Sequence, residues 1–407
     1  MKLLWTALLG LGLTLIIQSA LKKEISPYHP HPAPGYTPPY SINDDLARTC
    51  KMVANTEHLD GPETVAYVRS RDGKGDVGAV YAGTVDGMLW RLDLDFEGAA
   101  PVPVAFVGGR PLGMVAIEAE EEMDKEGSSV VSEVVYVADV EKGLIRVDVA
   151  LSAKNTAPGI VSVLARSVTP GSPRDEIVYA DDVDLCRKTG KIYFSDASTI
   201  RPWRKDDGSL DTMGASVEEA VTAKHSGSIL VYDPATRGVS VLARGLYFAN
   251  GVAVAHDGSY VLVSETFAAR ILKIPTTGPS KGVASVWVDD LPGYPDGISI
   301  TPDGKRAWIA VASPRSALLE RIHPYRFLKA LLSLIPQSWI PKPVRHGLVV
   351  EVDLATSSVL RSLHDPSDSV IGMVTAVEES PSGSSLLLGT LHGHGIVQCH
   401  DQATTTE

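Results

Sequence analysis

The sequence predicts an all-β protein, a single six-bladed β-propeller. A short apolar strand, a turn containing glycine and a second apolar strand follow one another six times along the 407 residues. Rings of such antiparallel units form propellers. The 36 glycines and 27 prolines favour many turns over long helices. At 44% hydrophobic residues, the chain can bury a large core.

Charge and cysteine content exclude two classes of function. The net charge is −12, and an acidic surface repels phosphate backbones, so we expect no nucleic-acid partner. The three cysteines form no CxxC pattern, which argues against a structural zinc site. Cys50 and Cys399 fall near the two ends of the expected ring, where a disulfide would join them. The alternative is three free thiols.

The N-terminus predicts a membrane anchor over residues 1–23. Residues 3–21 carry no charge, and lysines flank this stretch on both sides. A helix of that length reaches about 28 Å, close to the apolar thickness of a bilayer of about 30 Å. The alternative is a cleaved signal peptide, but the positions before a cleavage site match its small-residue requirement poorly. Membrane orientation is not readable from the flanking lysines.

A proline-rich linker is expected over residues 24–49. Six prolines fall between residues 27 and 39, a composition typical of a stiff, extended spacer that would hold the globular part off the membrane. We expect the propeller to span residues 50–400, followed by a disordered tail over 401–407.

The six turns provide the evidence for the repeat. Each turn ends in a glycine, and the turn glycines are Gly73, Gly127, Gly190, Gly258, Gly304 and Gly383. Apolar strands are expected directly after them, at 79–82, 134–137, 191–194, 260–263, 306–309 and 386–389. Third strands are expected at 87–93, 143–148, 227–233 and 347–353. A β-sandwich built from repeated hairpins is the alternative fold.

Three insertions explain the uneven spacing of the turns. The acidic stretch 118–126 and the polar stretch 201–224 are interpreted as insertions, the first as a solvated one. The segment 314–346 alternates large apolar residues with arginines and lysines, which predicts a cationic amphipathic helix. Such a helix would cover the channel as a lid, contact the membrane or pack against a blade.

The residues that begin the innermost strands point to a metal site. Equivalent positions of the six units are Glu63, Leu112, Asp181, Asn250, Asp296 and Met373. Four of these are oxygen donors, and such positions converge at one level of the propeller axis. Facing carboxylates would raise one another's pKa unless a cation bound them, and oxygen ligands without histidine or cysteine favour Ca²⁺. The alternative is that these residues only stabilise turns.

Several short sequence segments together resemble the strictosidine-synthase-like propellers, and most closely their adipocyte plasma-membrane-associated branch. This family belongs to the wider superfamily of paraoxonase-like enzymes. The segments are 61–64, 109–113, 191–196, 248–252, 291–296 and 362–366. This resemblance implies a six-bladed propeller outside the cytosol, in the endomembrane lumen or at the cell surface, with arylesterase-like hydrolase activity. It also places the superfamily's calcium ligands on Glu63, Asp181, Asn250 and Asp296.

Four positions depart from the superfamily pattern. Asp181 replaces the usual asparagine, and Gly297 stands where paraoxonases often supply a further asparagine ligand. Leu112 stands where paraoxonases carry a channel histidine. Met373 stands where strictosidine synthase uses a glutamate, which argues against its condensing reaction, although Glu378 is nearby in sequence.

The sequence therefore predicts a membrane-anchored, calcium-dependent hydrolase of small esters or lactones. Asp296 is the candidate nucleophile or water-orienting group. His364, His392 and His394 are further acid–base candidates, for which a turn or surface role is the alternative. Two other functions remain open: a condensing enzyme of the strictosidine synthase type, and a membrane-tethered binding propeller without turnover.

Overall fold

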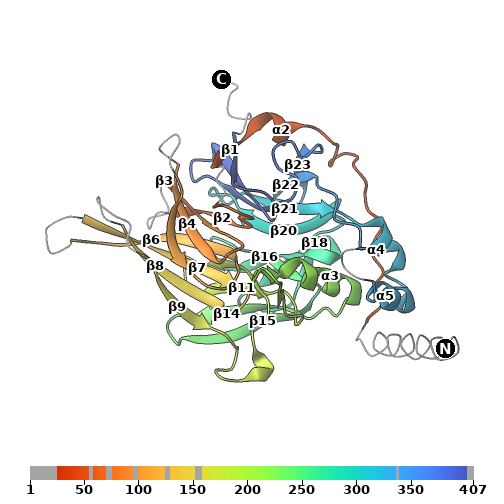
Figure 1. The fold of residues 1–407 in the computed structure, drawn as a ribbon, viewed down its shortest axis with the longest axis horizontal. Coiled ribbons are helices and arrows are strands. Elements are labelled where there is room, and N and C mark those ends of the chain that lie inside the picture. The colour runs from red at the N-terminus through yellow and green to blue at the C-terminus, as the bar shows by residue number, and fades with distance from the viewer. Residues whose placement is uncertain are drawn as a thin grey trace, which may run out of the picture.

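The computed structural model describes residues 25–54, 58–69, 76–94, 100–123, 129–151, 158–335 and 339–400 (Figure 1). The fold is all-β and propeller-like. It contains four separate four-stranded sheets and one eight-stranded sheet, besides a short two-stranded pair. The predicted anchor and the predicted C-terminal tail lie outside the described residues. No helix within the described part of the chain is long and apolar enough to cross a bilayer.

The four separate sheets are antiparallel, and each begins with an inner strand. The third unit contains β10 (Ala180–Leu185), β11 (Ile192–Asp196), β14 (Gly227–Asp233) and β15 (Gly238–Leu246). The fourth contains β16 (Ala249–Val254), β17 (Tyr260–Glu265), β18 (Arg270–Pro275) and β19 (Ser285–Val288). The fifth contains β20 (Gly293–Ile300), β21 (Arg306–Pro314), β22 (Gly347–Asp353) and β23 (Val359–Asp365). The last contains β24 (Val374–Glu379), β25 (Ser385–Thr390), β26 (Ile396–His400) and β1 (Cys50–Ala54).

The eight-stranded sheet consists of two antiparallel groups of four. One group is β2 (Val65–Arg69), β3 (Asp76–Gly83), β4 (Met88–Asp93) and β5 (Val102–Phe106). The other is β6 (Pro111–Met123), β7 (Ser129–Asp139), β8 (Gly143–Leu151) and β9 (Ile160–Ala165). A short parallel pairing of β2 with β6 joins them, at Val68 opposite Ala116 and Arg69 opposite Ile117.

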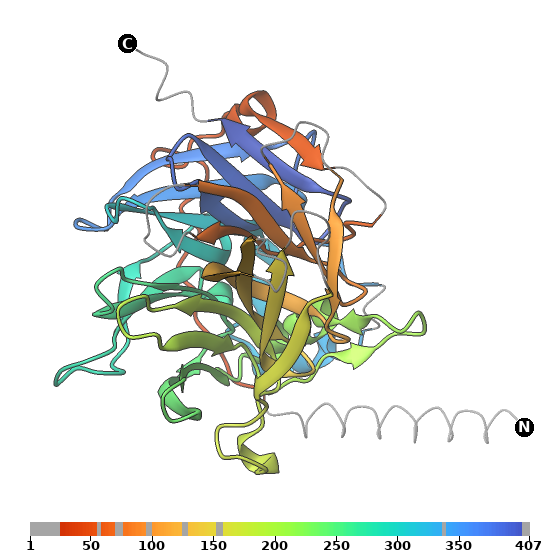
Figure 2. The same ribbon diagram turned by 90° about the vertical axis from the view of Figure 1, so that its left-hand side faces the viewer.

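The inner strands form a closed ring. β2 contacts β6, β6 contacts β10, and contacts continue through β16, β20 and β24 back to β2. Figure 2 shows the sheets arranged round a common centre in chain order, with the blue C-terminal sheet beside the orange N-terminal one. The start of each inner strand is thereby brought to the central axis.

The predicted hairpin repeat is confirmed wherever the turns are described. Gly190, Gly258, Gly304 and Gly383 all have positive φ, the conformation for which these turns need glycine. The turns at Gly73 and Gly127 lie outside the described residues. Every strand predicted to follow a turn is present.

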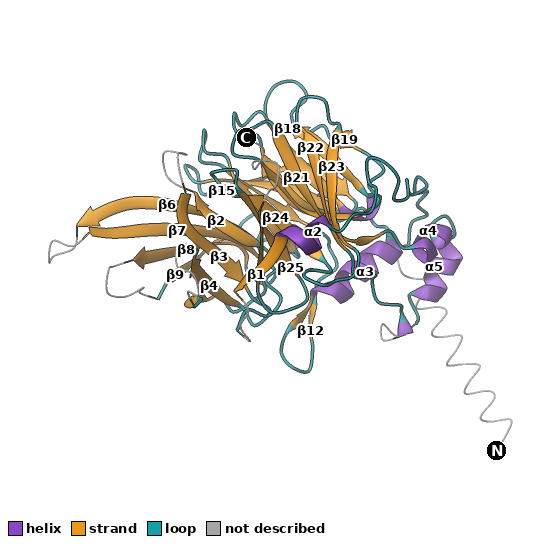
Figure 3. Cartoon of the chain, turned by 90° about the horizontal axis from the view of Figure 1, so that it is seen from above, coloured by secondary structure: helices purple, strands orange, loops and turns teal. Residues whose placement is uncertain are grey.

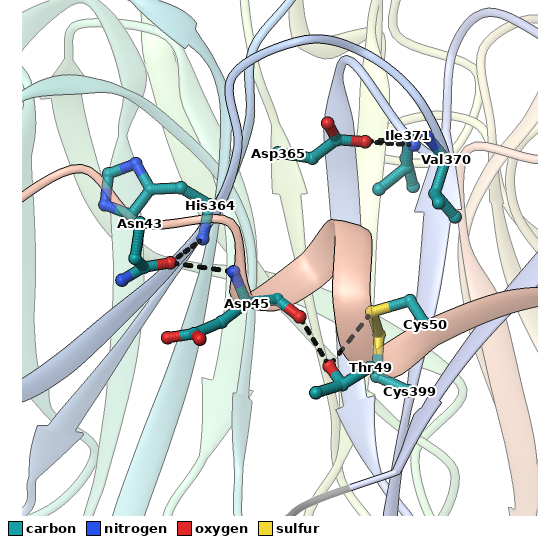
Figure 4. Close-up of a disulfide and its surroundings, with 9 residues drawn as sticks. All are labelled: Asn43, Asp45, Thr49, Cys50, His364, Asp365, Val370, Ile371 and Cys399. Carbon is teal, nitrogen blue, oxygen red and sulfur yellow. Dashed lines mark hydrogen bonds between the residues drawn. A yellow bond between two sulfur atoms is a disulfide. The ribbon is translucent and has the colours of Figure 1, made fainter.

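A disulfide closes the ring, as the cysteine positions predicted. The N-terminal strand β1 pairs with the C-terminal strand β26 and places Cys50 opposite Cys399. These two cysteines are bonded across 349 residues of sequence (Figure 4). Cys186 is a buried free thiol.

Two insertions gather at one end of the molecule (Figure 3). The 201–224 stretch forms the hairpin of β12 (Trp203–Arg204) and β13 (Leu210–Asp211), followed by helix α3 (Thr212–Thr222). The 314–346 stretch contains the predicted helical segment as α4 (Ala317–Ile322) and α5 (Arg326–Leu332). Helices α3 and α5 are in contact. Short 3-10 turns occur at η1 (Pro173–Asp175) and η2 (Thr266–Ala268).

The structure changes two expectations about irregular segments. The acidic stretch 118–126 is described as far as Met123, and this part is not a loop but continues strand β6, paired with β7. The proline-rich linker is not a free spacer either. Its side chains Ile25, Tyr40 and Leu46 are buried, the last in helix α2 (Asp45–Thr49). Burial of these apolar side chains holds the linker against the propeller.

Asn43 shows how this segment is attached. Its side-chain Nδ2 donates to the Ser362 carbonyl at 2.8 Å, and its Oδ1 accepts from the His364 backbone N–H at 3.0 Å. The same Oδ1 accepts from the Asp45 N–H at 3.1 Å and so begins helix α2 (Figure 4). The linker is thus fixed to the outer strand β23.

Candidate metal site in the channel

An irregularity in strand pairing places three of the four predicted site residues, and Glu63 lies just before β2. The register shifts between Ala180 and Val183, between Ala249 and Val252, and between Pro295 and Ile298. Asp181, Asn250 and Asp296 lie within these bulges. A bulge adds a residue to one strand and changes the direction of its side chains, and bulges are common beside active sites.

Glycines beside the site residues allow the inner strands to approach one another. A Cβ added at Gly251 would lie 2.3 Å from the carbonyl oxygen of Asp296, and one at Gly297 would lie 2.6 Å from that of Thr375. Only glycine fits at such distances. Gly297 is therefore needed for packing, so an asparagine ligand at this position would clash with β24.

The four predicted oxygen donors are brought together in a buried site. Glu63, Asp181, Asn250 and Asp296 are each 4–7% exposed. Burial raises the pKa of Asp181 and of Asp296 well above the usual range, and the charge of Glu63 raises both further. Burial likewise raises the pKa of Glu63 to about 7, against the opposing effect of Arg110. The carboxylates thus repel one another in a desolvated space.

Two of these carboxylates have an oxygen without a hydrogen-bond partner. Glu63 Oε2 and Asp181 Oδ2 are fully buried and accept no hydrogen bond from the described residues. Asp296 receives a hydrogen bond from the Asn250 side chain. Buried carboxylate oxygens without hydrogen bonds are costly and favour a nearby positive charge.

Arg110 is a fifth member of the site that the sequence argument missed. Its Nη2 lies 3.5 Å from Glu63 Oε2 and donates to the Gly61 carbonyl at 2.9 Å, while its Nη1 has no partner among the described residues. Burial lowers the pKa of this guanidinium. Three carboxylates and one arginine leave a formal charge of −2, which a divalent cation would neutralise. The clue to Arg110 in the sequence was its place as a basic residue two positions before the expected channel position Leu112.

The donor set fits calcium better than zinc. All four donors are carboxylate or amide oxygens, which hard cations prefer. Among the described residues, the three-residue cluster with ligand atoms within 4.8 Å of one another is His31, Asp289 and Asp290, at the surface. The channel carboxylates do not meet this spacing together, so the preference for calcium rests on the chemistry of the donor set.

Asp182 strengthens the channel wall next to the site. Its Oδ1 accepts from the Val183 N–H and its Oδ2 from the Val252 N–H, both at 2.8 Å, which links β10 to β16. Burial raises its pKa to about 7. The sequence offered a clue to this role, because Asp182 occupies a position at which β6, β16 and β20 carry glycine.

Helix α3 covers one end of the site. Leu112 is buried in a cluster with Tyr179, Phe248, Leu210 and Ala215, the last within α3. The Tyr179 hydroxyl donates to the Thr212 carbonyl at 3.1 Å. The 201–224 insertion is thus not merely polar: it closes the channel with an apolar and aromatic layer next to the oxygen donors.

The other end of the channel opens into a cavity of about 310 Å³. Apolar residues of the inner strands line it together with Arg69, Asp184 and Glu378. Arg69 pairs with Asp184 Oδ1 at 3.0 Å and with Glu378 Oε1 at 3.1 Å. Glu378 Oε2 accepts from the Tyr67 N–H at 2.9 Å. Glu378 is therefore held by partners and is no free base.

The remaining acid–base candidates do not join the site. His364 is fully buried on β23, the outer strand of its sheet, about 14 Å from the inner strand at about 4.8 Å per strand. There it contacts His346 Nε2 and Ser362 Oγ, each at 2.9 Å. His392 and His394 are exposed on the loop after β25. Met373 is a buried apolar residue directly before β24.

Comparisons with known proteins agree with this fold. The strictosidine synthase family model matches residues 181–279. Adipocyte plasma membrane-associated protein of Bos taurus is 30% identical over 392 residues, covering 91% of this chain and 85% of the relative. The chain belongs to this family of strictosidine-synthase-like propellers. Adipocyte plasma membrane-associated protein of Homo sapiens is 29% identical to this chain over 392 residues. Protein STRICTOSIDINE SYNTHASE-LIKE 10 of Arabidopsis thaliana is 26% identical over 364 residues, which cover 84% of this chain and 86% of that protein.

Two solved structures share the fold of this strictosidine-synthase-like chain. A gluconolactonase from Xanthomonas campestris superposes with a TM-score of 0.52 at 12% identity, covering 93% of this chain and 99% of its own. A luciferin-regenerating enzyme superposes with a TM-score of 0.51 at 12% identity, covering 86% and 95%. At such identity the likeness concerns the fold alone.

Proposed function

We propose that this protein is a membrane-anchored, calcium-dependent propeller hydrolase of small esters or lactones. The observation that carries the proposal is the buried cluster of Glu63, Asp181, Asn250 and Asp296, in which two carboxylate oxygens accept no hydrogen bond from the described residues. The lactonase named among the structures of similar fold supports a hydrolytic reaction. The fold is counted as six-bladed, with the eight-stranded sheet taken as two adjacent blades.

The chemistry divides between the ion and the chain. Calcium held by the four oxygen donors would polarise the ester carbonyl and stabilise negative charge in the transition state. Asp296 acts as nucleophile or as the base that accepts a proton from the attacking water. The Asn250 amide orients the Asp296 carboxylate, and α3 with Tyr179 and Phe248 excludes water.

Binding without turnover is the second candidate. It is favoured by Leu112, which fills with an apolar side chain the position expected to carry a proton-transferring histidine. A strictosidine-synthase-type condensation is disfavoured, because Met373 is apolar and Glu378 is held by Arg69.

The proposed location rests on the sequence and on relatives. The apolar stretch 3–21 would anchor the chain in a membrane, and relatives are named plasma membrane-associated. The resemblance implies a propeller outside the cytosol, and the Cys50–Cys399 disulfide supports this, because disulfides persist there.

Phenyl acetate hydrolysis tests the proposal. The purified full-length chain is assayed with Ca²⁺, with a chelator, and after Ca²⁺ is restored. We expect activity that disappears on chelation and is absent in Asp296→Ala, while the exposed control Asp207→Ala retains it. Unaltered hydrolysis in chelator would contradict the calcium requirement. Bound calcium without hydrolysis would support the binding protein instead.

A further inference from the structure

We infer that helices α4 and α5 form a second, lipid-facing surface that seats the propeller directly on the bilayer. This inference rests on the proposed N-terminal anchor and specifies how the protein meets the membrane. It departs from the expectation that the linker keeps the two apart.

The first observation is where the chain enters the folded part. Ile25 is buried against Ala330 of α5. The Ser26 N–H donates to the Thr222 carbonyl of α3 at 2.9 Å, and Lys329 Nζ of α5 donates to the Ser26 carbonyl at 2.5 Å. The Tyr28 N–H donates to the His323 carbonyl at 3.0 Å. Residues 25–28 are therefore attached to α3 and to the helical insertion that contains α4 and α5.

This attachment leaves no room for a spacer. The apolar stretch ends at residue 21, four residues before Ile25, and four residues span at most about 14 Å. If the stretch crosses a bilayer, α5 lies within that distance of the membrane surface.

The second observation is the character of the surface at that point. Lys329 and Ala330 face the protein and are buried, whereas Phe327, Leu328 and Leu331 of α5 are 41–60% exposed. An ordinary surface helix has the opposite arrangement, with polar residues outward. Leu318, Ile335 and Trp339 of the same insertion are also exposed, Trp339 to 77%. Large apolar side chains exposed in this number within one segment mark an interaction site.

The third observation identifies the partner as lipid. Arg321 and Arg326 are exposed beside the patch and form no ion pair with the described residues. Large apolar and aromatic side chains flanked by free arginines are typical of helices that lie in the membrane interface. The patch also lies on the insertion to which Ile25 and Ser26 are attached, just after the predicted anchor ends. A second copy of the chain would explain the apolar residues but not this continuity with the anchor.

The orientation has a consequence for the channel. Helix α5 contacts α3, and α3 covers the oxygen donors. Figures 1 and 3 show α3, α4 and α5 together at one end of the molecule, opposite the strands β6 to β9. Seating on α4 and α5 therefore turns the covered end of the channel towards the lipid.

A fluorescent probe in the full-length protein tests this surface. Phe327→Cys and the control Ile160→Cys are labelled with an environment-sensitive fluorophore and reconstituted into phosphatidylcholine vesicles with or without nitroxide-labelled lipid. Ile160, on β9, is exposed to 69%, and Phe327 to 60%, so the two sites are matched. Cys186 is buried, and the unsubstituted protein measures its labelling.

We expect a blue shift and at least twofold quenching by nitroxide lipid at position 327, with neither at position 160. Flotation with vesicles but no quenching at 327 would overturn the docking surface and leave the anchor intact. Failure to float would overturn the anchor and with it this inference. A blue shift at 327 without lipid quenching, rising with protein concentration, would show a contact between two copies and contradict lipid contact.

Discussion

Removal of one channel carboxylate should stabilise the calcium-free protein. Asp181 is buried, and Glu63 and Asp296 raise its pKa in addition to burial. Its Oδ2 lacks a partner among the described residues. Asp181→Asn keeps the shape and removes the charge. Removing a buried charge that like charges surround should gain about 1–3 kcal/mol in chelator at pH 8.

The sign of the pH dependence follows from the direction of the shift. The folded Asp181 carboxyl has a pKa above its unfolded value, so between these two values the folded state holds more protons. The free energy of unfolding of the calcium-free wild type therefore falls as pH rises through this window. The gain from Asp181→Asn should be absent near pH 4 and should grow as pH rises.

Calcium should reverse the ranking. The variant loses one of three anionic ligands and binds the ion more weakly, so added Ca²⁺ should stabilise the wild type more. For roughly 350 folded residues, 1 kcal/mol corresponds to about 1.4 °C in Tm, which predicts a rise of about 1–4 °C in chelator.

Differential scanning fluorimetry at pH 4 to 8, with chelator and with Ca²⁺, measures both effects. The exposed Asp207→Asn serves as the control for the same chemical change. A variant less stable than wild type in chelator at pH 8 would refute the account of mutual carboxylate repulsion.

Three further perturbations test separate parts of the fold. The double variant Cys50→Ser/Cys399→Ser should lose about 3–5 kcal/mol, because the disulfide closes a 349-residue loop, and an unchanged thermal midpoint would count against that role. Gly297→Ala should lower the free energy of unfolding by about 1–3 kcal/mol and weaken calcium binding, because its Cβ would lie 2.6 Å from the Thr375 carbonyl oxygen. The surface substitution Gly238→Ala is the control, and equal effects of the two in calorimetry would refute the packing argument. Burial lowers the pKa of His364 to about 4, so the unfolded state binds more protons, and the free energy of unfolding should fall as pH drops from about 6.5 towards 4. In urea unfolding, His364→Asn should show a weaker fall, and identical pH profiles for the two proteins would disprove this role of His364.

The sequence predicted most of the elements that depend on local patterns. Turn glycines and alternating apolar strands determine the hairpins, and the spacing of Cys50 and Cys399 indicated how the ring closes. The repeat also pointed to four oxygen-donor residues that the structure brings together, because each occupies the same place in its unit; their role as metal ligands stays a prediction.

The missed features depend on contacts between distant segments. Proline content indicated a stiff linker, but burial of Ile25 and Leu46 requires a partner surface that composition does not reveal. The cover of α3 over Leu112 and the pairing of Arg110 with Glu63 likewise join segments of different blades. No local pattern in the chain encodes these contacts.

Metal content tests the central claim most directly. Full-length wild type, Asp296→Asn and Asp207→Asn are dialysed against Ca²⁺ and then against metal-free buffer, and bound calcium is measured by elemental analysis. We predict about one calcium per chain in the wild type and in Asp207→Asn, and none in Asp296→Asn. Wild type without calcium, or Asp296→Asn with a full equivalent, would contradict a calcium site at the channel carboxylates.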